Sequence, residues 1–182
     1  LLNRLEITLI PTSQVNCCGA VTYHLNKQTE SLTFIKQNID AWWPLIEKGA
    51  EAIVITASGC GTMVKEYGHL LEDDPVYAAK AKLISEMTKD LCEVFTDELT
   101  TLKAKVLEPI KRKQSNECKV AFHAPCSLQH GQQIKGVVEN LLTNAGYTLT
   151  TIEDSHLCCG SAGTYSLLQP DLSEQLLDKK VE

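Results

Sequence analysis

Apolar residues recur along this chain with two periods, which predict helices and strands. Between residues 28 and 48 they return every three or four positions, as on one face of a helix, and Pro44 should kink or split that helix near its end. The same spacing predicts helices over 62–71, 76–95, 97–110 and 132–144, and others from about residues 162 and 171. Runs rich in β-branched residues predict strands over 4–10, 53–55, 119–122 and 147–152, and the polar stretch 111–117 indicates a linker.

The order of these elements also repeats. A strand-like run, Cys-Cys-Gly and then Thr-Tyr occur first around Cys17-Cys18-Gly19 and again around Cys158-Cys159-Gly160, with one more residue before the second Thr-Tyr. Such self-similarity predicts an internal duplication. Strands alternating with helices predict an α/β fold of two pseudo-repeated halves, with short, mostly parallel sheets flanked by helices. We expect a first half over 1–74, a helical connector over 75–115 and a second, C-terminally truncated half over 116–182.

Composition narrows the classes of protein that remain. The chain has 182 residues, 43% of them hydrophobic, and a formal net charge of −6. No basic run exceeds Lys111-Arg112-Lys113, which argues against nucleic acid as a partner. No apolar stretch approaches the roughly 20 residues of a membrane helix, and there is no signal-peptide pattern. We therefore expect a cytoplasmic protein, associated with a membrane only through a complex, and the eight cysteines favour metal chemistry over a secreted disulfide framework.

The spacing of the cysteines is regular. Cys18 and Cys60 enclose 41 residues, and Cys126 and Cys158 enclose 31. If each repeat reads Cys, about 31 residues, Cys-Cys-Gly, about 41 residues, Cys, then the first lacks its opening cysteine and the second its closing one. Those two cysteines would fall before residue 1 and after residue 182.

Adjacent thiolates on a turn suit a soft metal or an iron–sulfur cluster. Cys60, Cys126 and Cys158 each follow a predicted strand, and α/β folds place their sites at the carboxyl ends of strands. The candidate ligands are Cys17, Cys18, Cys60, Cys126, Cys158 and Cys159. His123 and His156 precede cluster cysteines closely, as substitute ligands or as hydrogen-bond donors behind the ligands. Cys92 and Cys118 lie outside these motifs and are expected to be core residues.

The motifs resemble the paired cysteine-rich CCG domains of the family that includes the glycolate oxidase iron–sulfur subunit. Related modules occur in heterodisulfide reductases, lactate-utilisation proteins and anaerobic glycerol-3-phosphate dehydrogenase. The segments that carry the resemblance are Cys17–Asn26, Asn38–Pro44, Ala57–Gly61, Phe122–His130 and Asp154–Tyr165. The Trp-Trp-Pro and Asp-Ser-His-Leu steps favour the glycolate oxidase branch.

The resemblance implies a non-catalytic electron-transfer subunit of an oxidoreductase of glycolate catabolism, with [4Fe-4S] clusters in the intact protein. Electrons would pass from a flavin-containing glycolate oxidase subunit to a membrane acceptor. The resemblance also implies an amino-terminal ferredoxin-like region, which this sequence lacks.

Two alternatives stay open. The same thiolates could hold zinc in a structural or interaction module, or the sites of this chain could stay empty. A catalytic cluster protein like the heterodisulfide reductases is the other alternative, although Cys60 is not followed by the second cysteine of a Cys-x-x-Cys closure.

Overall fold

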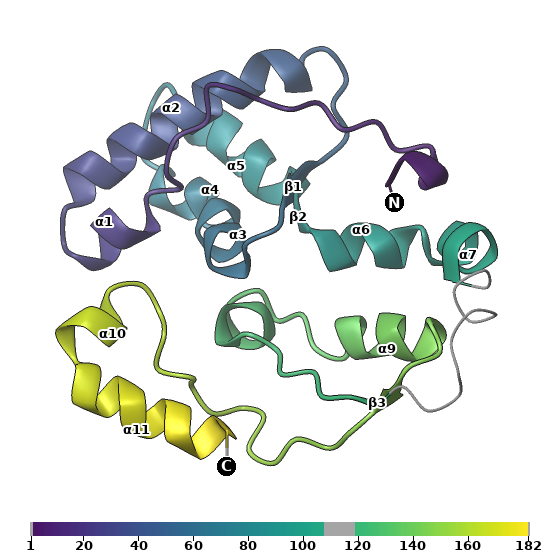
Figure 1. Ribbon diagram of the computed structural model, residues 1–182. Coiled ribbons are helices and arrows are strands. Elements are labelled where there is room, and N and C mark those ends of the chain that lie inside the picture. Colours follow the sequence, from purple (N-terminus) through teal and green to yellow (C-terminus); the bar gives the residue numbers. More distant parts are fainter. Residues whose placement is uncertain (1, 108–118, 182) are drawn as a thin grey trace.

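The computed structural model describes residues 2–107 and 119–181, which form two halves stacked one above the other (Figure 1). Up to residue 107 the elements are η1 (Leu2–Leu5), α1 (Ala20–His24), α2 (Gln28–Ile46), β1 (Ile53–Ile55), α3 (Ser58–Lys65), α4 (Tyr67–Leu70), α5 (Ala78–Met87), β2 (Thr88–Asp90), α6 (Leu91–Asp97), α7 (Leu99–Leu102) and η2 (Lys103–Leu107). From residue 119 they are β3 (Lys119–Val120), η3 (Ser127–Gly131), α9 (Val137–Asn144), β4 (Thr148–Leu149), α10 (Tyr165–Leu168) and α11 (Pro170–Val181).

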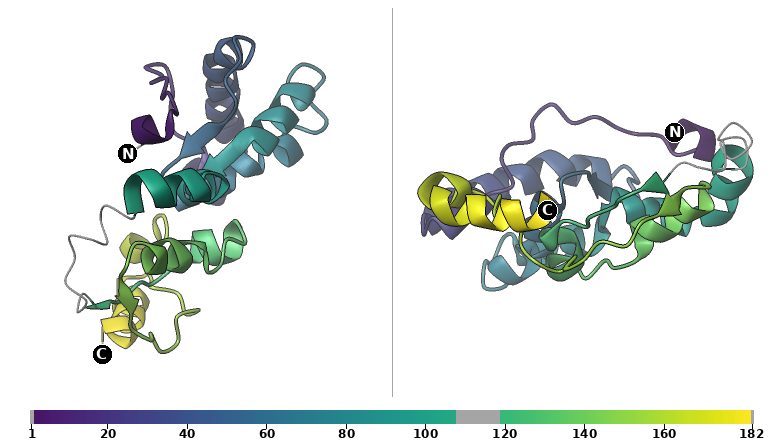
Figure 2. Two further views of the ribbon diagram at one scale, coloured as in Figure 1. Left: turned by 90° about the vertical axis from the view of Figure 1, so that its right-hand side faces the viewer. Right: turned by 60° about the horizontal axis from the view of Figure 1, so that its bottom comes forward.

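Each half contains one short parallel sheet. β1 pairs with β2 in the register Ile53 to Thr88 and Ile55 to Asp90. β3 pairs with β4 in the register Lys119 to Thr148. Among the described elements, α3 and α6 lie against the first sheet and α9 lies against β4 of the second. Figure 2 shows the two halves from two further directions. The predicted α/β fold with two halves and short parallel sheets is therefore confirmed.

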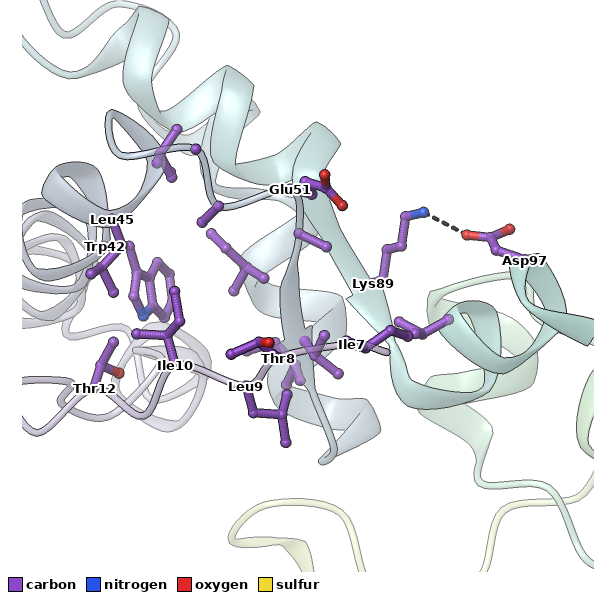
Figure 3. A pocket seen from close by; sticks show the side chains of 18 of the residues that line it. Ile7, Thr8, Leu9, Ile10, Thr12, Trp42, Leu45, Glu51, Lys89 and Asp97 are labelled. Carbon is purple, nitrogen blue, oxygen red and sulfur yellow. Dashed lines mark hydrogen bonds and ion pairs between the residues drawn. The ribbon is translucent and has the colours of Figure 1, made fainter. Parts of the chain in front are cut away.

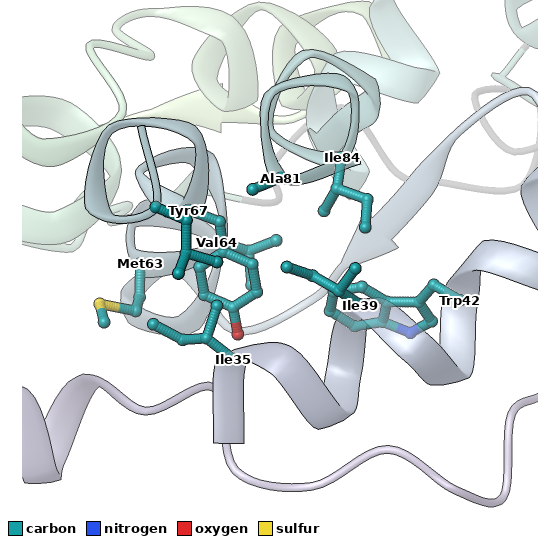
Figure 4. Packing of buried hydrophobic residues seen from close by; sticks show 9 residues of the cluster. Ile35, Ile39, Trp42, Met63, Val64, Tyr67, Ala81 and Ile84 are labelled. Atoms are coloured by element: carbon teal, nitrogen blue, oxygen red, sulfur yellow. The ribbon is translucent and has the colours of Figure 1, made fainter. Parts of the chain in front are cut away.

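The first half is built around one apolar cluster, in which α2 packs against α3, α4 and α5 (Figure 4). Its buried members are Ile35, Ile39, Trp42, Met63, Val64, Tyr67, Leu71, Ala81 and Ile84. The rings of Trp42 and Tyr67 stack with centroids 6.4 Å apart. α5 and β2 pack into this half although they follow residue 74, where we expected the first half to end. The expected boundaries remain predictions.

Two smaller clusters connect the halves. One joins η1, α7 and η2 to the end of α9 through Leu5, Leu102, Leu107 and Ala145. The other packs Cys92 of α6 against Leu128 and Ile134. Cys92 is therefore a buried core residue, as predicted, and burial raises the pKa of its thiol to about 12. Cys118 and the linker predicted over 111–117 lie outside the described residues.

The long helix predicted over 76–95 is wrong, because β2 interrupts it. Thr88 and Asp90 are buried where β2 pairs with β1. Asp90 then starts α6 as its N-cap: its carboxylate accepts from the backbone N–H of Cys92 at 3.0 Å, and Glu93 closes a capping box. A non-local strand pairing and a local cap together outweigh the helical periodicity.

Other boundaries also differ from the prediction. Residues 4–10 form no strand, because the chain leaves η1 at Leu5 and continues without a sheet partner. The helix expected over 62–71 starts earlier, at Ser58, and is divided into α3 and α4. Pro44 lies in the last turn of α2 and does not split it.

Several helices are shorter than predicted. The helix expected from residue 132 begins only at Val137, because Gln133 and Gly136 have φ of 58° and 72°. The helix expected from residue 162 shrinks to α10, because Gly163 has φ of 53°. In the described part of 97–110 only α7 and the π-helical turn η2 form. No helix of the described residues is long and apolar enough to span a bilayer.

Candidate functional site

The first Cys-Cys-Gly turn is fixed by its glycine. Gly19 has φ of 89°, in the left-handed region that favours glycine, and it caps the start of α1. A Cβ atom there would lie 2.8 Å from Ser31 Oγ. The Gly19 carbonyl accepts hydrogen bonds from Ser31 Oγ and Thr22 Oγ1, both at 2.9 Å. The turn is thereby attached to α2 and presents Cys17 and Cys18 at one end of the core.

Two buried polar side chains hold the backbone of this turn. Asn38 Nδ2 donates to the carbonyl of Cys17 at 2.9 Å and to Tyr67 Oη at 3.2 Å, and Tyr67 Oη donates to the carbonyl of Cys18 at 2.9 Å. Asn38 Oδ1 accepts from the backbone N–H of Asn16 at 2.8 Å. Asn38 and Tyr67 are both fully buried. Sequence reasoning gave these residues no role, although an asparagine within the apolar face of 28–48 was the available signal.

Cys60 joins this pair of cysteines from the other side. It lies in the first turn of α3, directly after β1. The pKa of the Cys18 thiol is raised to about 12, mainly by burial and also by its contact with Cys60 and the charges of Cys60 and Cys17. Burial likewise raises the pKa of Tyr67, to which the charges of the same three cysteines contribute. The structure therefore brings Cys17, Cys18 and Cys60 into one neighbourhood.

The second Cys-Cys-Gly turn repeats the construction of the first. Gly160 has φ of 76°, and its carbonyl accepts from Ser173 Oγ of α11 at 2.8 Å. A Cβ atom on Gly160 would lie 2.7 Å from the Ser173 carbonyl oxygen. Ser31 follows Gly19 by 12 residues and Ser173 follows Gly160 by 13, which is the one-residue difference already seen in the Thr-Tyr steps. This pair of serines was missed, because neither lies in a recognisable motif.

The thiols of the second turn have the same pattern of exposure as those of the first, with Cys17 and Cys158 exposed and Cys18 and Cys159 half-buried. Cys158 Sγ accepts from the backbone N–H of Gly160 at 3.3 Å. Cys159 Sγ lies 3.1 Å from Ser161 Oγ, and hydrogen bonds from Ser161 lower the pKa of the Cys159 thiol. A lower pKa favours the thiolate, which is the form that binds metals.

Cys126 is the N-cap of η3, in a loop that is hydrogen-bonded to the second turn. Gln129 Nε2 donates to the carbonyls of Ala124 and Ser155, at 3.0 and 3.1 Å. His130 Nε2 lies 3.3 Å from the carbonyl of His156. The loops of Cys126 and Cys158 are therefore connected, although no hydrogen bond among residues 119–181 joins their thiols.

The two candidate histidines differ. His123 Nε2 is buried without a hydrogen-bond partner among the described residues, whereas His156 is exposed and takes part through its backbone. A buried polar atom without a partner is uncommon and indicates a missing neighbour.

The two halves meet directly between the cysteine loops. Ser58 Oγ lies 2.7 Å from Ser127 Oγ, and Gln132 Nε2 donates to the Ser58 carbonyl at 2.9 Å. A Cβ atom on Gly61 would lie 2.7 Å from Gln132 Nε2, and one on Gly131 would lie 2.7 Å from Thr62 Oγ1. Gln132 thus covers Gly61, which adjoins Cys60, and Thr62 covers Gly131, at the end of the η3 turn that follows Cys126.

The donor set is that of a thiolate-bound group. All seven cysteines in the described residues are free thiols, three of them gathered around one turn. Among these described residues no three His, Cys, Asp or Glu side chains converge closely enough to bind a single metal ion. Thiolates are the ligands of iron–sulfur clusters, so the free cysteines of the two turns fit such a group by their chemistry.

Comparison with known proteins identifies the family. The cysteine-rich domain (CCG) family matches residues 1–65 and again residues 120–182, which correspond to the two repeats. The chain belongs to this family.

Curated relatives agree with this assignment. The chain is 52% identical over 180 residues to the glycolate oxidase iron–sulfur subunit of Escherichia coli (strain K12), an alignment that covers 99% of this chain and 42% of the relative. It is 31% identical to lactate utilization protein A of an Exiguobacterium species, covering 91% of this chain and 64% of the relative, and 32% identical to that of Bacillus velezensis, covering 94% and 66%. The chain therefore spans less than two thirds of the length of these relatives.

Proposed function

We propose that this chain supplies the cysteine ligands of iron–sulfur clusters in an electron-transfer subunit of a 2-hydroxy-acid oxidase. The observation that carries the proposal is the repeated turn, in which a left-handed glycine and a serine present a pair of thiols twice in one chain. The similarity to a glycolate oxidase iron–sulfur subunit supports glycolate as the substrate of the complete enzyme.

In this proposal Cys17, Cys18 and Cys60 hold one cluster, and Cys126, Cys158 and Cys159 hold the other. A bound cluster takes up and releases one electron at a time. The protein positions the thiolates: Asn38 and Tyr67 fix the carbonyls of the first pair, and backbone N–H groups such as that of Gly160 donate to sulfur.

The proposed course of electrons runs from a flavin-containing subunit, across this one, to a membrane acceptor. The chain itself does not bind the hydroxy acid. The contact of Ser58 with Ser127 at 2.7 Å supports the relay, since it joins the loops of the two cysteine sites. We propose that 1–74 and 116–182 are the cluster-binding halves, with 75–115 as connector, and that the complex lies in the cytoplasm at the membrane surface.

Anaerobic iron–sulfide reconstitution of the protein tests this function. Metal analysis should find iron and sulfide, with visible absorption and an electron paramagnetic resonance signal after reduction. Replacing Cys158 and Cys159 together by serine should remove about half of the iron, because one of two sites loses a ligand pair.

The control is Cys92→Ala, which removes a buried cysteine outside both sites and should leave the iron content unchanged. Unchanged iron in the double serine variant would contradict ligation by that pair. Stoichiometric zinc without visible absorption would replace the electron-transfer role by a structural one.

A further inference from the structure

A groove of about 770 Å³ lies in the first half, and none of the described cysteines lines it (Figure 3). Its walls are the segment Leu5–Ile10 and the strand β1, with Trp42 and Leu45 of α2 at one end and Val94 of α6 at the other. The lining is mainly apolar. The Lys89–Asp97 ion pair, with Nζ and Oδ2 2.5 Å apart, lies at its polar end.

Backbone groups on both walls lack hydrogen-bond partners in the part of the chain that the structure describes. There β1 pairs only with β2, so its other edge faces the groove. Thr8, Leu9 and Ile10 make no hydrogen bonds within the described residues, and Leu9 and Ile10 are each 56% exposed. An open strand edge beside exposed apolar residues is a ready position for another strand.

The groove has the dimensions of a strand. Residues in a sheet rise about 3.3 Å, neighbouring strands lie about 4.8 Å apart, and packed layers are about 10 Å apart. One residue of a covered strand therefore fills roughly 160 Å³, and a groove of about 770 Å³ takes about five residues. The ends of α2 and α6 would cover it, as helices cover the strands of a parallel sheet.

The internal repeat identifies the strand that is missing from the groove. In the second half β4 leads to the Cys-Cys-Gly turn and pairs with β3, the strand that precedes Cys126. Leu5–Ile10 leads to the first Cys-Cys-Gly turn and so corresponds to β4, but no described strand corresponds to β3 there. By this correspondence, the partner strand would belong to polypeptide on the amino-terminal side of Leu1.

We propose that the groove receives a β-strand from polypeptide preceding Leu1, which adds in parallel to the free edge of β1 and pairs on its other side with residues 5–10. The sheet would then have the order 5–10, new strand, β1, β2. The strand should resemble Lys119–Phe122, apolar with one basic residue. Glu51 and Glu98 on the groove have no ion pair among the described residues and suit that basic residue.

One consequence links the groove to the cysteines and depends on the proposed function. β3 ends shortly before Cys126, so the inserted strand would deliver the opening cysteine of the first repeat. The carboxyl end of β1, where Cys60 follows, is the edge at which that cysteine would arrive.

The test is hydrogen–deuterium exchange at single backbone amides. It compares the 182-residue chain with a chain that carries the proposed preceding polypeptide before Leu1. Amides of β1 that face the groove should exchange at least tenfold more slowly in the extended chain, and those of Thr8–Ile10 should become protected. Unchanged exchange would overturn the proposal. Protection that rises with protein concentration and accompanies dimerisation would assign the groove to a second copy and also overturn it.

Matched variants in the extended chain sharpen the result. Ile10→Asp places a charge on the groove and should abolish most of the gained protection. Val76→Asp changes an apolar residue that is 65% exposed and lies outside the groove, and it should leave the gain intact. Equal effects of both variants would count against insertion. Iron plays no part in this measurement, so the strand and the cluster proposals can fail independently.

Discussion

The helices that follow the two Cys-Cys-Gly turns start from the same lock but differ in burial. In α2, Ser31 bonds the turn, and Ile35 and Ile39 beyond it are 0% exposed. In α11, Ser173 makes the same bond, but Leu177 and Val181 at the corresponding positions are 50% and 74% exposed. What differs is the cover: α3, α4 and α5 lie over α2, whereas among the described elements α11 packs mainly against α10, a single turn.

This difference shows that the turn and the core are separate parts of the design. The left-handed glycine conformation and the hydrogen bond from the serine form without a packed core, because both are present at Gly160. Packing of the second thiol of each pair depends on the elements that come after the next strand, since Cys18 packs against the first core, whereas its counterpart Cys159 packs into no apolar cluster of the described residues.

The largest expected effect comes from truncating matched residues of the two helices. Ile35→Ala should lower the free energy of unfolding by about 2–5 kcal/mol, because it leaves a cavity in a filled core. Leu177→Ala should change it by less than about 0.5 kcal/mol, because that side chain is half exposed. Urea titrations followed by circular dichroism measure both. Similar losses would mean that α11 is covered in solution.

A smaller effect should separate the close approach of the turn from its backbone strain. Gly19→Ala and Gly49→Ala both place alanine in the left-handed region, at φ of 89° and 96°. Only Gly19 has Ser31 within 3 Å of the new Cβ, whereas Gly49 has open space. Gly19→Ala should therefore destabilise the protein by about 1–3 kcal/mol more than Gly49→Ala, measured by thermal unfolding. If the two variants are equally stable, α2 moves to accommodate the methyl group.

The third effect concerns the buried tyrosine that holds the Cys18 carbonyl. Tyr67→Phe removes one donor and one acceptor, so the carbonyl and an N–H of Asn38 lose a buried partner. We expect a loss of about 1–2 kcal/mol. Tyr77→Phe is the control, since that hydroxyl bonds Asp40 at an exposed position, and it should cost less than about 0.5 kcal/mol. Chemical denaturation of both variants measures the loss of unfolding free energy in each. Equal losses would contradict a larger contribution of the buried hydrogen bond.

The sequence predicts the parts of this fold that depend on local pattern. Ile53–Ile55 is a compact β-branched run, and the strand forms there. Thr88–Asp90 is polar and lies within a helical periodicity, so its pairing with β1 has no local signal. Residues 5–10 have the composition of a strand but no partner among the described residues, which shows that composition cannot supply pairing.

The same division holds for the site. The cysteines are evident from type and spacing, because few structural roles need repeated vicinal thiols. Their use as ligands stays a prediction. Asn38, Tyr67 and the serines of the turn depend on hydrogen bonds across 12 to 49 residues. Such contacts are fixed only once helices have packed, so residue type alone does not reveal them.

The glycine contacts between the halves set the distance between the two sulfur-bearing ends. The side chain of Gln132 packs on Gly61, and the side chain of Thr62 packs on Gly131, so each half contributes one glycine and one packing side chain. A Cβ atom at Gly131 would press against Thr62, a short side chain with little freedom to move, and so against the other half. A Cβ atom at Gly61 would instead displace the flexible end of Gln132, which bonds the Ser58 carbonyl. Two hydrogen atoms, where other residues have side chains, thus let the loops that carry Cys60 and Cys126 approach each other closely.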